Sequence, residues 1–187
     1  MIDIPYKLSK WQLIMLAVIS VSYSMFVIFT VSCTANIYRY LVLGVIMVFA
    51  AAVDLATYTL PDHLTLGATL LGIVLPGGRL GKSLQGGLVG LSIMLVITYL
   101  SHGGMGGGDI KLTLAIGTFL GWPLVIPALV LAFLLGGTCG LILILTRAKC
   151  ISDCIPFGPF LALGALISSL WGQELMQWYL VVIWGQI

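Results

Sequence analysis

Eight apolar stretches fill most of this chain, and only short polar connections separate them. Crossing the hydrocarbon core of a bilayer takes about 20 apolar residues in a helix. A backbone in lipid must also satisfy its hydrogen bonds internally, as a helix does. The sequence therefore predicts an all-α polytopic membrane protein, one bundle of about eight transmembrane or membrane-embedded helices. The stretches cover residues 11–33, 37–57, 64–76, 84–100, 110–121, 123–145, 160–171 and 175–187, the last two forming a closing pair.

The composition excludes several classes of protein. Of 187 residues, 60% are hydrophobic and 7% are charged, whereas soluble domains carry about 25% charged residues. The mean hydropathy is +1.18, and a soluble fold has too little polar surface for such a sequence. The net charge of +2 offers no basic patch for nucleic acid. Because the stretches use nearly all the length, residues 1–187 are expected to form one domain.

The cysteines do not predict a metal site. None of the four forms a Cys-x-x-Cys pair, and a structural zinc site would need two such pairs. Cys150 and Cys154 are one helical turn apart, which by itself is a weak signal for metal or disulfide chemistry. We expect no metal and no cofactor.

Glycines recur at helical spacing inside the apolar stretches, where small residues let helix backbones approach closely. Packing is therefore the expected role of Gly86, Gly87, Gly90, Gly136, Gly137 and Gly140.

The basic residues predict an orientation, because Lys and Arg are enriched in short cytoplasmic loops. A cytoplasmic N-terminus puts five cations inside and three outside. The inner set is Lys7, Lys10, Lys111, Arg147 and Lys149, and the outer set is Arg39, Arg79 and Lys82.

Asp54 follows an apolar run at residues 46–53, inside a predicted span. A carboxylate near the bilayer centre costs a few kcal/mol, so it requires water, a partner or a function. Taken alone, it can also be a paired or solvated acid at the membrane interface.

Asp109 ends a glycine-rich segment, residues 103–108, and opens the next apolar stretch. Residues without Cβ allow close approach of another backbone, so an extended substrate could bind against Gly106, Gly107 and Gly108. No Gly-Lys-Ser/Thr follows, which disfavours a phosphate-binding loop. Taken alone, Asp109 can also be the N-cap of a helix that starts at Ile110.

Two predicted spans, 64–76 and 84–100, separate Asp54 from Asp109, and two crossings return the chain to the side that it left. Both carboxylates are therefore expected at the same membrane face. Two close carboxylates tend to share one proton. The ionised member can activate water while the protonated member hydrogen-bonds the carbonyl oxygen, which is enough chemistry to hydrolyse an amide.

Neighbouring polar residues have simpler expected roles. Asp62 follows Pro61 at the start of an apolar stretch, so an N-cap is expected there. His63 and His102 are expected at the solvated interface. Lys111 either follows the positive-inside tendency or biases Asp109 toward ionisation.

Three ordered segments resemble the type IV prepilin peptidase family. Asp54 with residues 59–66 is similar to the first family signature, an Asp followed by a Pro-Asp-x-Leu-Thr segment. Residues 104–112 resemble the second signature, the Gly-x-Gly-Asp motif with its trailing Lys, and residues 155–162 resemble a third segment near the C-terminal end. The resemblance runs from about residue 45 to residue 170.

The resemblance implies an intramembrane aspartic endopeptidase of the bacterial inner membrane, active at the cytoplasmic face. Such enzymes cut after a glycine, between the basic leader and the hydrophobic helix of type IV prepilins or type II secretion pseudopilins. Asp54 and Asp109 would be the catalytic pair, and residues 155–160 would lie near them. Substrate contacts would come from Pro61, Asp62, Gly106, Gly107, Gly108 and Lys111.

One departure from the family concerns methylation. Many members carry an insertion with two Cys-x-x-Cys pairs, associated with zinc and with methylation of the new terminus. No such insertion lies between the first two stretches here, so the resemblance extends to the peptidase and leaves methyltransferase activity doubtful.

Other function classes stay open. Intramembrane acids also occur in ion- or proton-coupled transporters, and the Gly-x-Gly-Asp motif occurs in intramembrane aspartyl proteases with other substrates. A structural subunit with two incidental acids is a third class. The expected partners are prepilin substrates and membrane lipids, with no nucleic acid, and the oligomeric state is left open.

Overall fold

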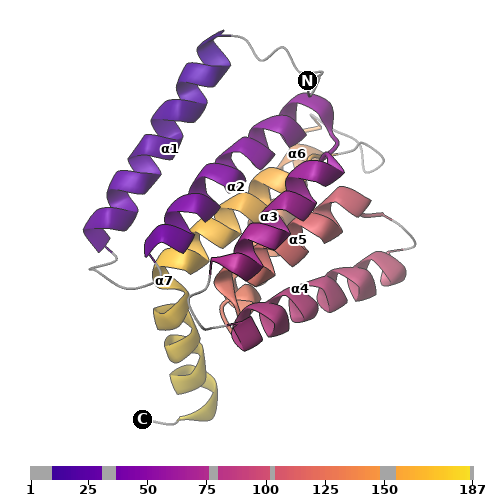
Figure 1. Cartoon of the computed structure of the whole chain (residues 1–187). Coiled ribbons are helices and arrows are strands. Elements are labelled where there is room, and N and C mark those ends of the chain that lie inside the picture. The colour runs from indigo at the N-terminus through magenta and orange to yellow at the C-terminus, as the bar shows by residue number, and fades with distance from the viewer. Residues whose placement is uncertain (1–9, 31–36, 76–79, 102–103, 148–154, 186–187) are drawn as a thin grey trace.

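The computed structural model describes residues 10–30, 37–75, 80–101, 104–147 and 155–185. In these ranges the chain forms seven helices and no strand, which confirms the all-α prediction (Figure 1). The helices are α1 (Lys10–Thr30), α2 (Ile37–Thr57), α3 (Asp62–Val74), α4 (Leu80–Leu100), α5 (Gly107–Leu120), α6 (Val125–Leu145) and α7 (Gly158–Trp184).

Three of the described helices, α2, α4 and α6, are long and apolar enough to cross a membrane by length and composition. Each has 21 residues, or about 30 Å at a rise of about 1.5 Å per residue. Helices α3 and α5 are shorter, at 13 and 14 residues. The polytopic helical architecture is confirmed.

Short helix α5 lies at the centre of the bundle, packed against α3, α4 and α7. Its buried side chains form a large part of the core, and these are Leu112, Ala115, Ile116 and Phe119. Helix α2 packs against α7, and α6 also packs against α7. Figure 1 shows α1 and α4 at opposite edges of the bundle.

Glycine allows α4 and α5 to pack closely. A Cβ on Gly86 or on Gly117 would meet the carbonyl oxygen of the other residue. The predicted packing role of Gly86 is thus confirmed, because no side chain fits at this crossing. On α6 the same prediction is wrong for Gly137, where a Cβ would meet nothing within 4 Å.

Stretches 160–171 and 175–187 do not form separate helices. Helix α7 continues without a break from Gly158 to Trp184. Gly172 marks the expected interruption, yet a single glycine costs a helix only about 1 kcal/mol. Its missing side chain leaves room for Leu124, whose Cδ2 would lie 3.1 Å from a Cβ at that position.

Arg39 joins three helices at one end of the bundle. Its Nη2 donates hydrogen bonds to Thr118 O at 2.6 Å, Ser83 Oγ at 3.0 Å and Gly72 O at 3.5 Å. Thr118 and Gly72 lie in the last turns of α5 and α3, where a cation is favoured by the unsatisfied carbonyls. Arg39 is expected among the loop cations of the outer face, whereas it lies in the first turn of α2 and is 4% exposed.

Candidate active site

Asp54 lies in the last turn of α2 and is 5% exposed. The helix ends at Thr57, and Tyr58 turns the chain with a φ of 55°. The Oδ2 atom of Asp54 accepts a hydrogen bond of 2.8 Å from the backbone N–H of Gly158. Gly158 is the first residue of α7, so the carboxylate faces the N-terminus of that helix.

Gly158 has no room for a side chain. A Cβ there would lie 2.6 Å from Asp54 Oδ2 and 3.0 Å from Asp54 Cγ. The preceding Phe157 stacks on Phe133 of α6 with ring centroids 5.2 Å apart, which anchors the segment. The expectation that residues 155–160 lie beside Asp54 is therefore confirmed.

Asp109 is the third residue of α5, which begins at Gly107 with Gly106 as its N-cap. The alternative that Asp109 is the N-cap is therefore wrong, because the glycine segment itself enters the helix. Asp109 precedes the apolar part of α5. Burial, and then the negative charge of Asp54, raise the pKa of the Asp109 carboxyl to about 6.

The interaction between these two charges is the central feature of the site. Helices α3 and α4 separate Asp54 from Asp109 along the chain, and the two antiparallel crossings bring both carboxyls to the same end of the bundle. Arg39, at the start of α2, marks the opposite end. Close carboxylates disfavour double ionisation, so this pair tends to retain one proton.

The three glycines before Asp109 differ in their surroundings. Gly106 and Gly107 are exposed, and a Cβ at Gly107 would meet nothing within 4 Å. A Cβ on Gly108 would lie 2.9 Å from Leu60 Cβ. Gly108 thus allows the chain before α3 to pack against α5, and the open backbone lies at Gly106 and Gly107.

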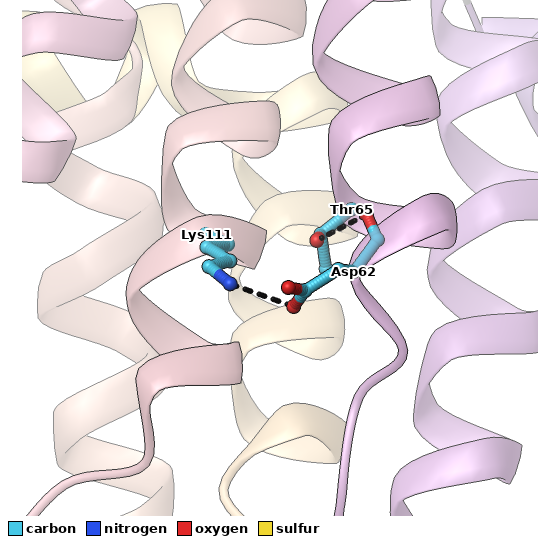
Figure 2. A network of polar contacts seen from close by, with 3 residues as sticks. All are labelled: Asp62, Thr65 and Lys111. Carbon is cyan, nitrogen blue, oxygen red and sulfur yellow. Dashed lines mark hydrogen bonds and ion pairs between the residues drawn. The ribbon is translucent and has the colours of Figure 1, made fainter.

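Asp62 and Lys111 form an ion pair beside the site, with Nζ 2.7 Å from Oδ1 (Figure 2). Pro61 is the N-cap of α3 and Asp62 makes no capping bond, so the predicted N-cap role of Asp62 is wrong. Thr65 Oγ1 donates to the carbonyl oxygen of Asp62 at 3.1 Å. Lys111 binds Asp62, and the two side chains remain 40% and 64% exposed.

Other polar residues of the sequence analysis do not extend the site. His63 is exposed, as expected of an interfacial side chain. His102, Cys150 and Cys154 lie outside the described residues. Within the ranges that the structure describes, no three His, Cys, Asp or Glu side chains come together as metal ligands would.

An apolar groove of about 420 Å³ runs beside the Asp54 end of α2, between α1, α2 and α7. Leu55 and Pro159, the neighbours of Asp54 and Gly158 in the chain, line one end of it. Val48, Ala52 and Leu163 extend it toward the middle of α2 and α7. Sequence reasoning missed this groove, because each of these residues reads simply as part of an apolar helix.

Comparison with known proteins shows that this sequence is similar to leader peptidases. The type IV leader peptidase family matches residues 41–141, a range that includes both acids. A protein of Aeromonas salmonicida named prepilin leader peptidase/N-methyltransferase is 37% identical over 152 residues, covering 76% of this chain and 52% of the relative. Proteins of the same name from Legionella pneumophila and Pseudomonas aeruginosa are each 33% identical, over 72% and 68% of this chain and 50% and 47% of theirs.

The chain spans about half the length of the curated relatives that it matches. No solved structure matches it significantly.

Proposed function

Because the chain belongs to the type IV leader peptidase family, we propose that it is an aspartic endopeptidase that removes the leader of a type IV prepilin or a type II secretion pseudopilin. Asp54 and Asp109 form its catalytic pair. The observation that carries this proposal is that the two carboxyls, separated by α3 and α4 along the chain, share one end of the bundle, where the charge of Asp54 acts on Asp109.

Two carboxyl groups with one proton supply the whole reaction. The carboxylate takes a proton from water as the oxygen attacks the scissile carbonyl carbon, and the carboxylic acid donates its proton to the carbonyl oxygen. The tetrahedral intermediate then collapses as the amide nitrogen receives a proton and leaves. Neither a metal nor a nucleophilic side chain takes part.

The surroundings of the pair suit a substrate that is half extended and half helical. Exposed backbone at Gly106 and Gly107 can hydrogen-bond an extended segment, and we assign Pro61, Asp62 and Lys111 to the same substrate-binding rim. The groove beside Asp54 suits an apolar helix entering from the bilayer. A leader junction followed by a hydrophobic helix combines these two features.

We place the active site at the cytoplasmic face of the inner membrane. The end of the bundle that holds the acid pair also holds Lys111, and positive charge favours the cytoplasmic side. No observation favours the transporter alternative, because both acids lie within one turn of a helix end rather than at mid-bilayer.

The test is cleavage of a prepilin co-expressed with the full chain in a host without its own leader peptidase. Wild type should shorten the prepilin, and Asp54→Asn and Asp109→Asn should each abolish shortening. Glu174→Gln, on the distant part of α7, is the matched control and should cleave normally. Full processing by either aspartate variant would refute the assignment.

Mass spectrometry of the mature terminus would report the cleavage position and any added methyl group. The relatives are named prepilin leader peptidase/N-methyltransferase, and the methyltransferase part of the name refers to those proteins. For this chain we propose hydrolysis alone, so an unmethylated product is expected.

A further inference from the structure

The two acids of the catalytic pair have different surroundings. Asp54 accepts a 2.8 Å hydrogen bond from Gly158 N–H at the start of α7, a helix of 27 residues. In the part of the chain that the structure describes, no donor hydrogen-bonds the Asp109 carboxyl, although Asp109 sits in the first turn of its own helix. The pair is therefore asymmetric.

We propose that the Gly158 amide holds Asp54 as the ionised base, so that Asp109 carries the proton of the pair and acts as the acid. This assignment rests on the proposed peptidase function. Gly158 is then a positioning residue, which acts on the reaction through Asp54.

A hydrogen bond to a carboxylate favours its charged form, and charge-assisted bonds are about twice as strong as neutral ones. The N-terminus of α7 adds a partial positive charge beside Asp54, and the amide that bonds the carboxylate is that of Gly158. The fit is tight, because a Cβ on Gly158 would lie 3.0 Å from Asp54 Cγ. The carboxylate is thus in direct contact with the backbone of Gly158, and a side chain at that position would displace it.

The remaining charged groups at this end do not reverse the assignment. Lys111 and Asp62 neutralise each other in an exposed pair, and His63 is exposed. Burial favours the neutral form of both acids, so the hydrogen bond from Gly158, which Asp54 accepts, is what distinguishes them.

With this assignment, each proton transfer of the reaction has a defined donor and a defined acceptor. Water gives a proton to Asp54 as its oxygen bonds the carbonyl carbon, while Asp109 gives its proton to the carbonyl oxygen. Collapse of the intermediate moves the proton from Asp54 to the amide nitrogen as the C–N bond breaks. The proton on the former carbonyl oxygen returns to Asp109, so both acids regain their starting states.

Infrared spectroscopy tests the assignment without substrate, so it is independent of whether the protein cleaves a prepilin. The full chain in lipid nanodiscs is titrated, and the C=O stretch of protonated carboxyls is followed. A band that disappears near pH 6 should be present in wild type and absent in Asp109→Asn. In Asp54→Asn the band should remain and disappear at a lower pH, because the neighbouring charge that raises the pKa of Asp109 is gone. A band that persists in Asp109→Asn, or that is lost in both variants, would overturn the assignment.

A second experiment tests the role of Gly158. Gly158→Ala should displace the amide from Asp54, so the acid limb of the cleavage–pH profile should move to higher pH while a reduced rate remains. Gly137→Ala is the matched control, because a Cβ there meets open space. Loss of rate at every pH with an unchanged profile would mean that Gly158 serves packing alone and would overturn its positioning role.

Discussion

The backbone N–H of Gly158 lies 2.8 Å from the Oδ2 atom of Asp54, although 104 positions separate the two residues. This contact joins the end of α2 to the start of α7. The charge of Asp54 also acts on the carboxyl of Asp109, which lies at the start of a third helix, α5. Three helix termini thus meet at one end of the bundle, where backbone N–H groups of the helix starts are available as donors.

The first prediction concerns Asp109 and the pH dependence of stability. Its pKa is raised from 3.8 to about 6, so the folded protein holds this proton more tightly than the unfolded chain does. Ionisation therefore destabilises the fold as pH rises from about 4 to about 6. The melting temperature of Asp109→Asn should exceed that of wild type at about pH 8 and should be nearly equal to it at about pH 4.

Tryptophan-fluorescence melts in one detergent at both pH values measure this effect. A stability difference that is equal at both pH values, or larger in acid, would contradict the raised pKa.

The second prediction concerns Arg39, which donates to Thr118 O, Ser83 Oγ and Gly72 O. Arg39→Met would leave these buried acceptors without their donor, at an expected cost of about 2–4 kcal/mol. Melting temperature and detergent resistance are the measurements. Lys82→Met, at an exposed cation of the same end, should change stability by less than about 0.5 kcal/mol; equal effects of the two variants would argue against the buried network.

The third prediction concerns the crossing of α4 and α5. Gly117→Ala would place a Cβ against the Gly86 carbonyl oxygen, and overpacking of this kind costs about 1–3 kcal/mol. Gly81→Ala, on the same helix as Gly86 but facing open space, should be neutral or stabilising. Thermal melts of the two variants compare the sites directly, and a neutral Gly117→Ala would show that the helices separate readily.

The fourth prediction concerns Asp62 and Lys111. Both side chains of their ion pair are exposed, so removing the pair should change the free energy of unfolding by about 0–1 kcal/mol. If the pair belongs to the substrate-binding rim, Lys111→Met should raise KM for a prepilin and leave kcat nearly unchanged. Peptide-cleavage kinetics separate the two constants; a fall in kcat at constant KM would instead assign Lys111 to the chemistry.

Much of the architecture was predictable, because apolar length alone specifies helices in a membrane. The bounds of α2 agree with the expected 37–57. The end of the chain was harder to predict: Gly172 and the polar residues after it suggested two helices, yet nothing there breaks α7. Local composition indicates where a helix is weakened, but one glycine costs about 1 kcal/mol, which is too little to end a helix of good helix formers.

The sequence alone determined that Asp54 and Asp109 share one end of the bundle, because the two apolar stretches between them cross the bundle twice and return the chain to the same end. It did not determine that Lys111 pairs with Asp62, that Arg39 donates to three other helices, or that Gly158 faces Asp54. Those contacts depend on how each helix is rotated about its axis and shifted along it. A helix that is apolar on all sides carries no stripe to indicate its inward face, so only the packed bundle decided them.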